Sequence, residues 1–196
     1  MIINIDNCDF NNDYFHFTNK TNINSILNEG LKPKIGVASK LVGDRANVSV
    51  SKGGKGIMGI INSFIYKFYM GLRIIDIPQE YRHYFLEIDD FNSKDSISKD
   101  IACRAMIRKL KEEVYLRIIL DDEKLKQAKV GGLTGYDVNL PIEIDKSCIE
   151  IITNEENRIL SAYEVAKYVY EKAKDKEIFR KMHEDFFYMY EMKECN

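Results

Sequence analysis

The chain has 196 residues, of which 45% are hydrophobic and 31% are charged, and its formal net charge is -2 at pH 7. This length suits one sizeable core better than two, and the near-neutral charge excludes a strong bulk attraction for nucleic acid, although a local basic groove stays open. The four cysteines are far apart and show no Cys-x-x-Cys spacing, which argues against zinc and against a disulfide framework.

The first residues, 1–6, lack the positive region and long apolar run of a secretory signal. The least charged run, 56–66, is well short of the roughly 20 residues that span a bilayer. We therefore expect a soluble, cytoplasmic protein with reduced thiols and no membrane segment.

An apolar run at 14–18 carries one histidine and predicts a strand, in which His16 presents its ring on one face while its neighbours fill the core. An amphipathic helix is predicted next at 21–31. Thr21 can cap its first turn, and Gly30 supplies a left-handed residue for its end. Because a helix start offers unpaired N–H groups to an anion, this order predicts a nucleotide site.

Residues 31–47 lack periodicity and predict a surface loop, and the alternation at 48–51 predicts a short strand. The glycine-rich tract 52–56 lacks the spacing and the Gly-Lys-Ser/Thr end of a Walker loop, so a flexible strand-to-helix turn is favoured over a phosphate loop. An apolar helix at 57–69 follows. Its aromatic side chains suit the core, and one tyrosine could also contact a ligand.

In the second half, strands are predicted at 84–88, 136–142 and 148–153, the last two as a hairpin. Residues 101–120 predict a helix, or a helix followed by a strand, with the charged residues on a solvated face. The helical pattern at 161–192 predicts either a cover on the core or an element that binds a partner.

The sequence resembles a known fold in three segments: His16-Phe17-Thr18, the helical motif at 22–33 and Val48-Ser49-Val50-Ser51. Together they look like the amino-terminal half of the ADP-ribosyltransferase fold, in the histidine-containing branch shared by poly(ADP-ribose) polymerases, RNA 2'-phosphotransferases and DNA-modifying toxins. The pair of strands at 136–153 fits the closing strands more loosely. The resemblance implies an α+β fold with a split antiparallel β core, flanking helices and a helical C-terminus. It places the domain at 1–155 and a helical extension, packed on it, at 156–196.

The same resemblance implies NAD as substrate and no metal. In the family, the first-strand histidine contacts the adenosine ribose, and the residue two positions later holds the nicotinamide amide through its backbone, which corresponds to His16 and Thr18. An aromatic residue near the second motif strand commonly stacks on nicotinamide. This chain has Ser49 and Ser51 there, so the stacking residue would come from the next helix, as Tyr66 or Tyr69.

Cleaving the nicotinamide bond builds positive charge on the ribose, so the site needs hydrogen bonds to the ribose hydroxyls, an apolar wall and ideally a carboxylate. Phe17 or a helix tyrosine can form the wall. The family glutamate on a late strand has no clean match, and the candidates are Asp137, Asn139 and Glu143. Arg45 suits the pyrophosphate because guanidinium groups match phosphate oxygens, and a solvated loop arginine is the alternative.

The leading hypothesis is transfer of ADP-ribose from NAD to a macromolecule, either protein or nucleic acid. The main alternative is a non-catalytic module that binds nucleotide or a partner, because Asn139 can stand where the family has glutamate. An RNA 2'-phosphotransferase activity is less attractive because arginines near the motif are sparse. Without the motif, His16 would be a buried residue bonded to backbone; His83 and His183, which lack such context, are expected on the surface.

Overall fold

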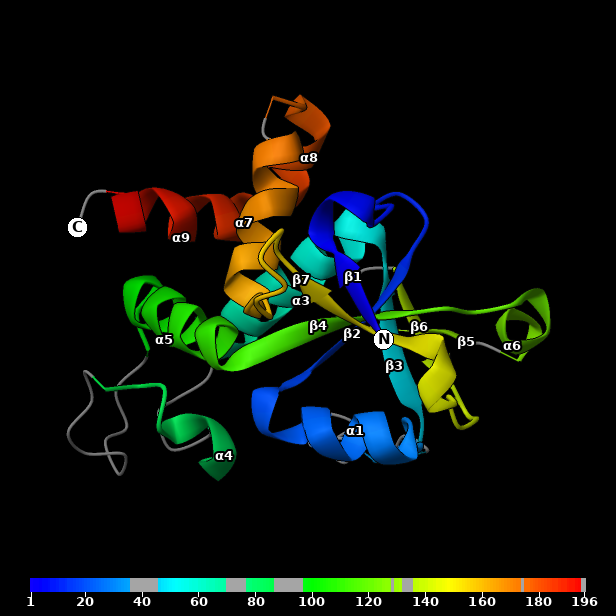
Figure 1. The fold of residues 1–196 in the computed structure, drawn as a ribbon. Coiled ribbons are helices and arrows are strands. Elements are labelled where there is room, and N and C mark those ends of the chain that lie inside the picture. The colour runs from blue at the N-terminus through cyan, green and yellow to red at the C-terminus, as the bar shows by residue number, and fades with distance from the viewer. Residues whose placement is uncertain are drawn as a thin grey trace.

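A mixed β-sheet runs through the protein, with helices on both faces (Figure 1). The computed structural model describes residues 1–35, 46–69, 77–86, 97–127, 129–131, 136–173 and 175–194. Within these ranges the strand order is β1-β7-β4-β2-β3-β6-β5. The strands are β1 (Ile2–Asn4), β2 (Tyr14–Asn19), β3 (Val48–Lys52), β4 (Glu113–Ile118), β5 (Lys129–Gly131), β6 (Asp137–Leu140) and β7 (Ile149–Thr153). The predicted α+β class is therefore confirmed.

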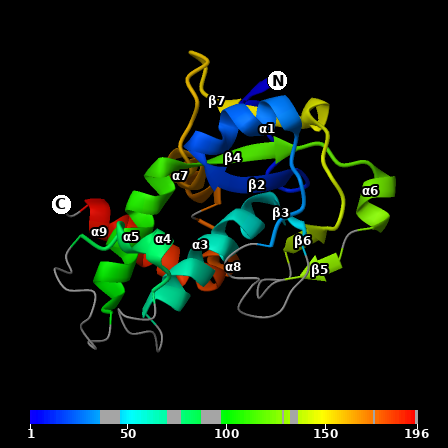
Figure 2. The same cartoon turned by 90° about the horizontal axis from the view of Figure 1, so that it is seen from below.

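One helix lies on one face of the sheet, and the long helices lie on the other (Figure 2). The α-helices are α1 (Ile23–Glu29), α3 (Gly53–Tyr69), α4 (Gln79–Arg82), α5 (Lys99–Glu112), α6 (Asp122–Lys126), α7 (Ala162–Ala173), α8 (Glu177–Met182) and α9 (Glu184–Glu194). Short 3-10 turns occupy Ile5–Asn7, Lys20–Asn22 and Lys146–Cys148. None of these helices is long and apolar enough to cross a membrane. Helices α7 and α9 add buried residues to the same core cluster as α3 and α5.

Side chains of β2 alternate between the two faces of the sheet, so its residues contact the long helices and α1 in turn. Phe15 is fully buried and packs with Phe17 against the long helices, whereas Tyr14 packs with the cluster beneath α1. Because successive side chains of a strand point to opposite faces, His16 and Thr18 lie on the α1 face.

The sheet opens between β2 and β3. These two strands pair only through Tyr14 with Lys52 and Phe15 with Ser51. In contrast, β2 pairs with β4 along all six of its residues, and β3 pairs with β6 over four. Beyond Phe15 the two halves of the sheet therefore separate, and a side chain of β2 can enter the gap.

Two strand predictions were wrong. Strands β6 and β7 do not form a hairpin, because β6 pairs with β3 and β5 while β7 pairs with β4 and β1. Residues 84–86 of the strand predicted at 84–88 form turns, and residues 87–88 lie outside the described ranges. Strands β1 and β5 were not predicted at all.

The glycine-rich tract contains the predicted strand-to-helix turn and continues as the first turn of α3, and it is not a phosphate loop. Helix α3 begins at Gly53, directly after β3, and the positive φ of 62° at Gly53 turns the chain between them. The Gly53 N–H donates to the Asp13 carbonyl and the Gly54 N–H to the Phe10 carbonyl, each at 2.8 Å. Because these N–H groups are used within the protein, they are not offered to a phosphate.

The start of the first helix differs from its prediction, and its end agrees. Thr21 does not cap a helix; it lies within a 3-10 turn and its N–H donates to Asn19 Oδ1 at 2.9 Å. At the other end Gly30 has the expected left-handed backbone, with φ of 79°, and its N–H donates to the Ile26 carbonyl. The second reading of 101–120, a helix followed by a strand, is confirmed by α5 and β4.

Candidate functional site

A cavity of about 300 Å³ lies between α1 and the open edge of β3. Strand β2 contributes two of the predicted site residues, His16 and Thr18, and β3 contributes Ser49. The other lining residues come from α1, from the segment after it and from the start of β3: Asn22, Ser25, Ile26, Glu29, Gly30, Leu31, Lys32, Lys34, Asn47 and Val48. The nucleotide site predicted between the first motif strand and the following helix thus corresponds to a cavity.

His16 bridges the gap where the two halves of the sheet separate. Its Nδ1 lies 2.9 Å from the carbonyl oxygen of Ser49. Because a carbonyl only accepts, Nδ1 carries the proton. Burial lowers the pKa of His16, so the ring is neutral at neutral pH and Nε2 has a free lone pair. The ring therefore makes the backbone contact expected of an ordinary buried histidine and still offers an acceptor to a ligand hydroxyl.

The backbone on the open side of β2 belongs to Phe17. Gly53 N–H donates to the Asp13 carbonyl on the β3 side, and alternate residues of a strand direct their peptide groups to the same side. Phe17, four residues after Asp13, therefore directs its N–H and C=O into the gap, whereas Thr18 directs its own toward β4. The Thr18 side chain is buried and accepts a hydrogen bond from Asn22 Nδ2 at 3.1 Å.

Ser49 connects the cavity to β6. Its Oγ lies 2.9 Å from Asn47 Oδ1 and 2.8 Å from Asn139 Oδ1, and Ser49 and Asn139 are register partners. A hydroxyl donates only one hydrogen bond, so one amide accepts it and the other can donate to the same oxygen through its NH2 group. By strand alternation the side chains of Ser49 and Asn139 point to the same face as Ser51 and Asp137, and Asn139 is not among the residues that line the cavity.

Of the two carboxylate candidates, Asp137 lies on the face opposite to His16 and Glu143 lies nearer to the cavity. Asp137 pairs in register with Ser51, and both are on the face that packs against the long helices, opposite to His16. Ser51 is fully buried, and a Cβ on Gly56 would lie only 2.9 Å from the Ser51 Cβ. Glu143 is exposed and lies close enough to Lys32 to help raise the pKa of that lysine, behind the larger effect of Glu29. Glu143 is thus near the cavity rim.

Two further predicted contacts, Tyr66 and Tyr69, are not brought to this cavity. Tyr66 and Tyr69 line a different cavity on the far side of α3, so neither is placed to stack on a ring held by His16. Arg45 lies outside the described residues.

Sequence reasoning missed the two lysines of the lining. Lys32 pairs with Glu29 at 3.0 Å, and Lys34 is exposed beside the bridge that joins its backbone to Asn47. The sequence did contain a signal for them, because these two basic residues flank Pro33. They directly follow the helix whose first turn is predicted to bind a nucleotide. No cluster of three or more potential metal ligands is present in the described part of the chain.

Comparisons of the chain with protein-family models, with curated proteins and with solved structures gave no match.

Proposed function

We propose that the protein binds NAD in the His16 cavity and transfers ADP-ribose to a macromolecular acceptor, either protein or nucleic acid. The observation that carries this proposal is the neutral His16 ring in the gap between β2 and β3, with Nδ1 bonded to Ser49 and Nε2 left as an acceptor. A ribose hydroxyl is the natural donor for such an atom, because hydroxyls both donate and accept. The short β2–β3 pairing agrees with the split β core of the ADP-ribosyltransferase fold.

The surrounding groups suit the rest of a dinucleotide. Lys32 and Lys34 provide positive charge for a pyrophosphate at the mouth of the cavity. The Phe17 peptide presents one donor and one acceptor toward the gap, which is the pattern that a carboxamide complements. Hydrogen bonds that hold the ribose rigidly favour the positively charged transition state of nicotinamide loss.

A non-catalytic NAD-binding module of the same fold is the second candidate, and Asn139 favours it. The Asn139 amide is bonded to Ser49 on the strand beside the second motif strand, and the resemblance makes it one candidate for the position of the family carboxylate. An amide can hold a ribose hydroxyl, but it supplies no negative charge to an oxocarbenium-like transition state. An RNA 2'-phosphotransferase is less favoured, because the cations of the described lining are limited to two lysines.

The test is NAD binding by purified protein, followed by nicotinamide release alone and with cell lysate. We expect His16→Ala to weaken NAD binding at least about tenfold, because it removes one hydrogen bond to the ligand and the contacts of the imidazole ring. His83→Ala, at an exposed histidine, is the matched control and should bind as the parent does.

The outcomes separate the candidates. Transfer of ADP-ribose to a lysate component, detected by mass spectrometry and lost in His16→Ala, would establish a transferase and identify its acceptor class. Saturable binding without nicotinamide release would establish the module. Failure of the parent protein to bind NAD would rule out both.

A further inference from the structure

A second, larger cavity of about 690 Å³ lies between α3 and the junction of α8 and α9. It shares no lining residue with the His16 cavity. Its lining is Lys55, Gly59, Asn62, Ser63, Tyr66, Tyr69, Lys99, Tyr136, Lys181, Met182, His183, Glu184 and Asp185. This volume is within the range of about 300–1,000 Å³ that is typical of small-molecule sites.

His183, expected on the surface, is instead buried in the wall of this cavity with only 2% of its surface exposed. Its Nε2 is buried and has no hydrogen-bond partner in the described part of the protein. Buried polar atoms are nearly always satisfied, and an unsatisfied one costs free energy. The His183 side chain lines the cavity, so a small rotation of the ring would bring Nε2 to an atom of a bound ligand, which would satisfy it.

The neighbouring Asn62 fixes which ring nitrogen carries the proton. Asn62 Oδ1 accepts from the Phe186 N–H at 2.8 Å, so its other atom must be the NH2 group. That Nδ2 donates to the Met182 carbonyl at 3.2 Å and lies 3.4 Å from His183 Nδ1. Nδ1 is therefore the acceptor of the neutral ring and Nε2 carries the hydrogen. The unpartnered group is a donor, which calls for an acceptor oxygen on the ligand.

Lys55 makes the same corner of the cavity attractive to an anion. Its ammonium group is exposed and, together with the larger effect of burial, lowers the pKa of His183 to about 4, which keeps the ring neutral. Lys55 has no ion pair among the described residues. The other two lysines of the lining are paired, Lys99 with Asp185 at 2.8 Å and Lys181 with Glu177 at 3.6 Å.

Aromatic side chains also line the cavity. Tyr66 is half-exposed and packs edge-on against Tyr69, with ring centroids 6.2 Å apart. Tyr136, at the start of β6, also lines the cavity. An exposed tyrosine face stacks on nucleobases of any sequence, which contributes roughly 1–3 kcal/mol per base.

We propose that this cavity is a second ligand site, which binds a nucleoside monophosphate with its phosphoryl group on His183 Nε2–H and Lys55 and its base against Tyr66. The inference goes beyond the proposed function and holds whether or not NAD binds at His16.

The test follows the imidazole nitrogens by NMR in protein with isotope-labelled histidine. The chain has three histidines, and single His variants assign the signals of each ring. Adenosine 5'-monophosphate, adenosine and inorganic phosphate are titrated separately. We expect the monophosphate to shift His183 Nε2 saturably, phosphate to do so at least about tenfold more weakly, and adenosine to leave it unchanged. No saturable shift at His183, or a shift confined to His16, would overturn the proposal; equal binding of phosphate would overturn its base contact.

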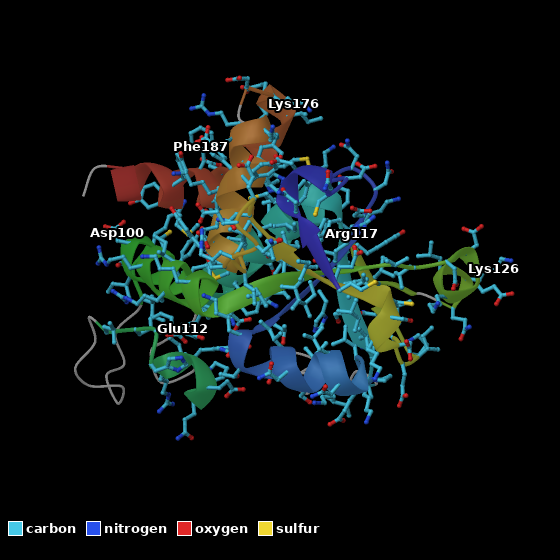
Figure 3. The ribbon with its side chains drawn as sticks, in the orientation of Figure 1. Asp100, Glu112, Arg117, Lys126, Lys176 and Phe187 are labelled. Atoms are coloured by element: carbon cyan, nitrogen blue, oxygen red, sulfur yellow. The ribbon has the colours of Figure 1, made fainter. Side chains whose placement is uncertain are left out.

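Two variants and one control complete the experiment. His183→Phe removes the donor and keeps the ring against Phe179, whose centroid lies 4.5 Å away, so it should fold. Lys55→Gln removes the cation. Both should abolish binding. Lys126→Gln, at an exposed residue of α6 that lies away from α8 and α9 (Figure 3), should bind as the parent does. An equal loss in Lys126→Gln would show a non-specific charge effect and overturn the proposal.

The phosphoryl group can come from a free nucleotide or from a nucleic acid end. A short single strand with a 5'-phosphate is the discriminating probe. If only the mononucleotide binds, the ligand is a free nucleotide. If the mononucleotide and the 5'-phosphorylated strand both bind, the site accepts the end of a nucleic acid chain.

Discussion

Lys109 and Glu113, one turn apart where α5 passes into β4, form a buried ion pair with Nζ 2.5 Å from Oε1. Each residue is less than a tenth exposed. Four aromatic rings surround the ammonium group at 5.0–5.7 Å from Nζ: Phe17, Phe64, Tyr81 and Tyr84. For Lys109 and Glu113 the expectation of a solvated helix face is wrong, whereas Lys111 and Glu112 are exposed as expected. The pair also attaches α5 to Phe17, the neighbour of His16.

We predict that Glu113→Gln lowers the free energy of unfolding by about 3–5 kcal/mol, because it leaves a buried ammonium group without its counter-charge. The double variant Lys109→Met/Glu113→Leu should recover much of that loss, since apolar groups fill the same aromatic surroundings without desolvation of charge. Urea unfolding of the single and double variants measures both effects. A loss below about 1 kcal/mol in Glu113→Gln would mean that the pair is hydrated in solution.

The buried His183 predicts a dependence of stability on pH. Burial, with a smaller effect of Lys55, lowers the pKa of His183 from 6.5 to about 4. Between these values the unfolded chain binds a proton that the folded chain does not, so the stabilisation is complete above pH 6.5 and is lost as the pH falls toward 4. The full loss is about 3 kcal/mol, from 1.36 kcal/mol per pKa unit.

The measurement compares parent and His183→Phe across this window. Carboxylates titrate in both proteins, so the difference between their unfolding free energies at pH 7 and pH 4.5 isolates the histidine. We expect the parent to lose more stability than the variant on acidification. Parallel pH profiles would contradict a buried, neutral His183.

Local patterns in the sequence were sufficient for β2, the body of α1, β3 and the body of α3, because each depends on neighbours a few residues away. They left the step from α5 to β4 as one of two alternatives. They could not give the sheet order, since the partners of β6 and β7 are set by contacts distant in sequence. His183 shows the same limit: the Asn62 amide that orients it lies 121 residues away along the chain. The His16 gap depends on where the β2–β3 pairing stops, and alternation does not encode that position.

Gly30 positions the segment that leaves α1 along the His16 cavity. Its φ of 79° disfavours any side chain, and a Cβ there would lie 2.4 Å from the Ile144 carbonyl oxygen. We predict that Gly30→Ala destabilises the fold by about 1–3 kcal/mol, the usual cost of such backbone strain. Thermal unfolding of the parent and the variant checks this. An unchanged melting temperature would show that the turn has another stable conformation.

The decisive substitution for catalysis is Asn139→Glu. It places a carboxylate at the register partner of Ser49, next to the gap that His16 bridges but on the long-helix face of the sheet. If the nicotinamide ribose lies in that gap, negative charge there can stabilise the cationic ribose of a departing nicotinamide. If NAD binds at His16, we expect nicotinamide release to rise about 100-fold or more, the size of effect that a positioned carboxylate commonly supplies. Asn139→Gln has a side chain as long as that of Asn139→Glu but without the charge, and it should release nicotinamide at the parent rate.

Release is measured at saturating NAD, with binding checked for each variant, so that affinity and turnover are separated. If Asn139→Glu binds NAD as tightly as the parent and releases nicotinamide no faster, this position does not face the scissile bond, and Asp137 becomes the carboxylate to replace next.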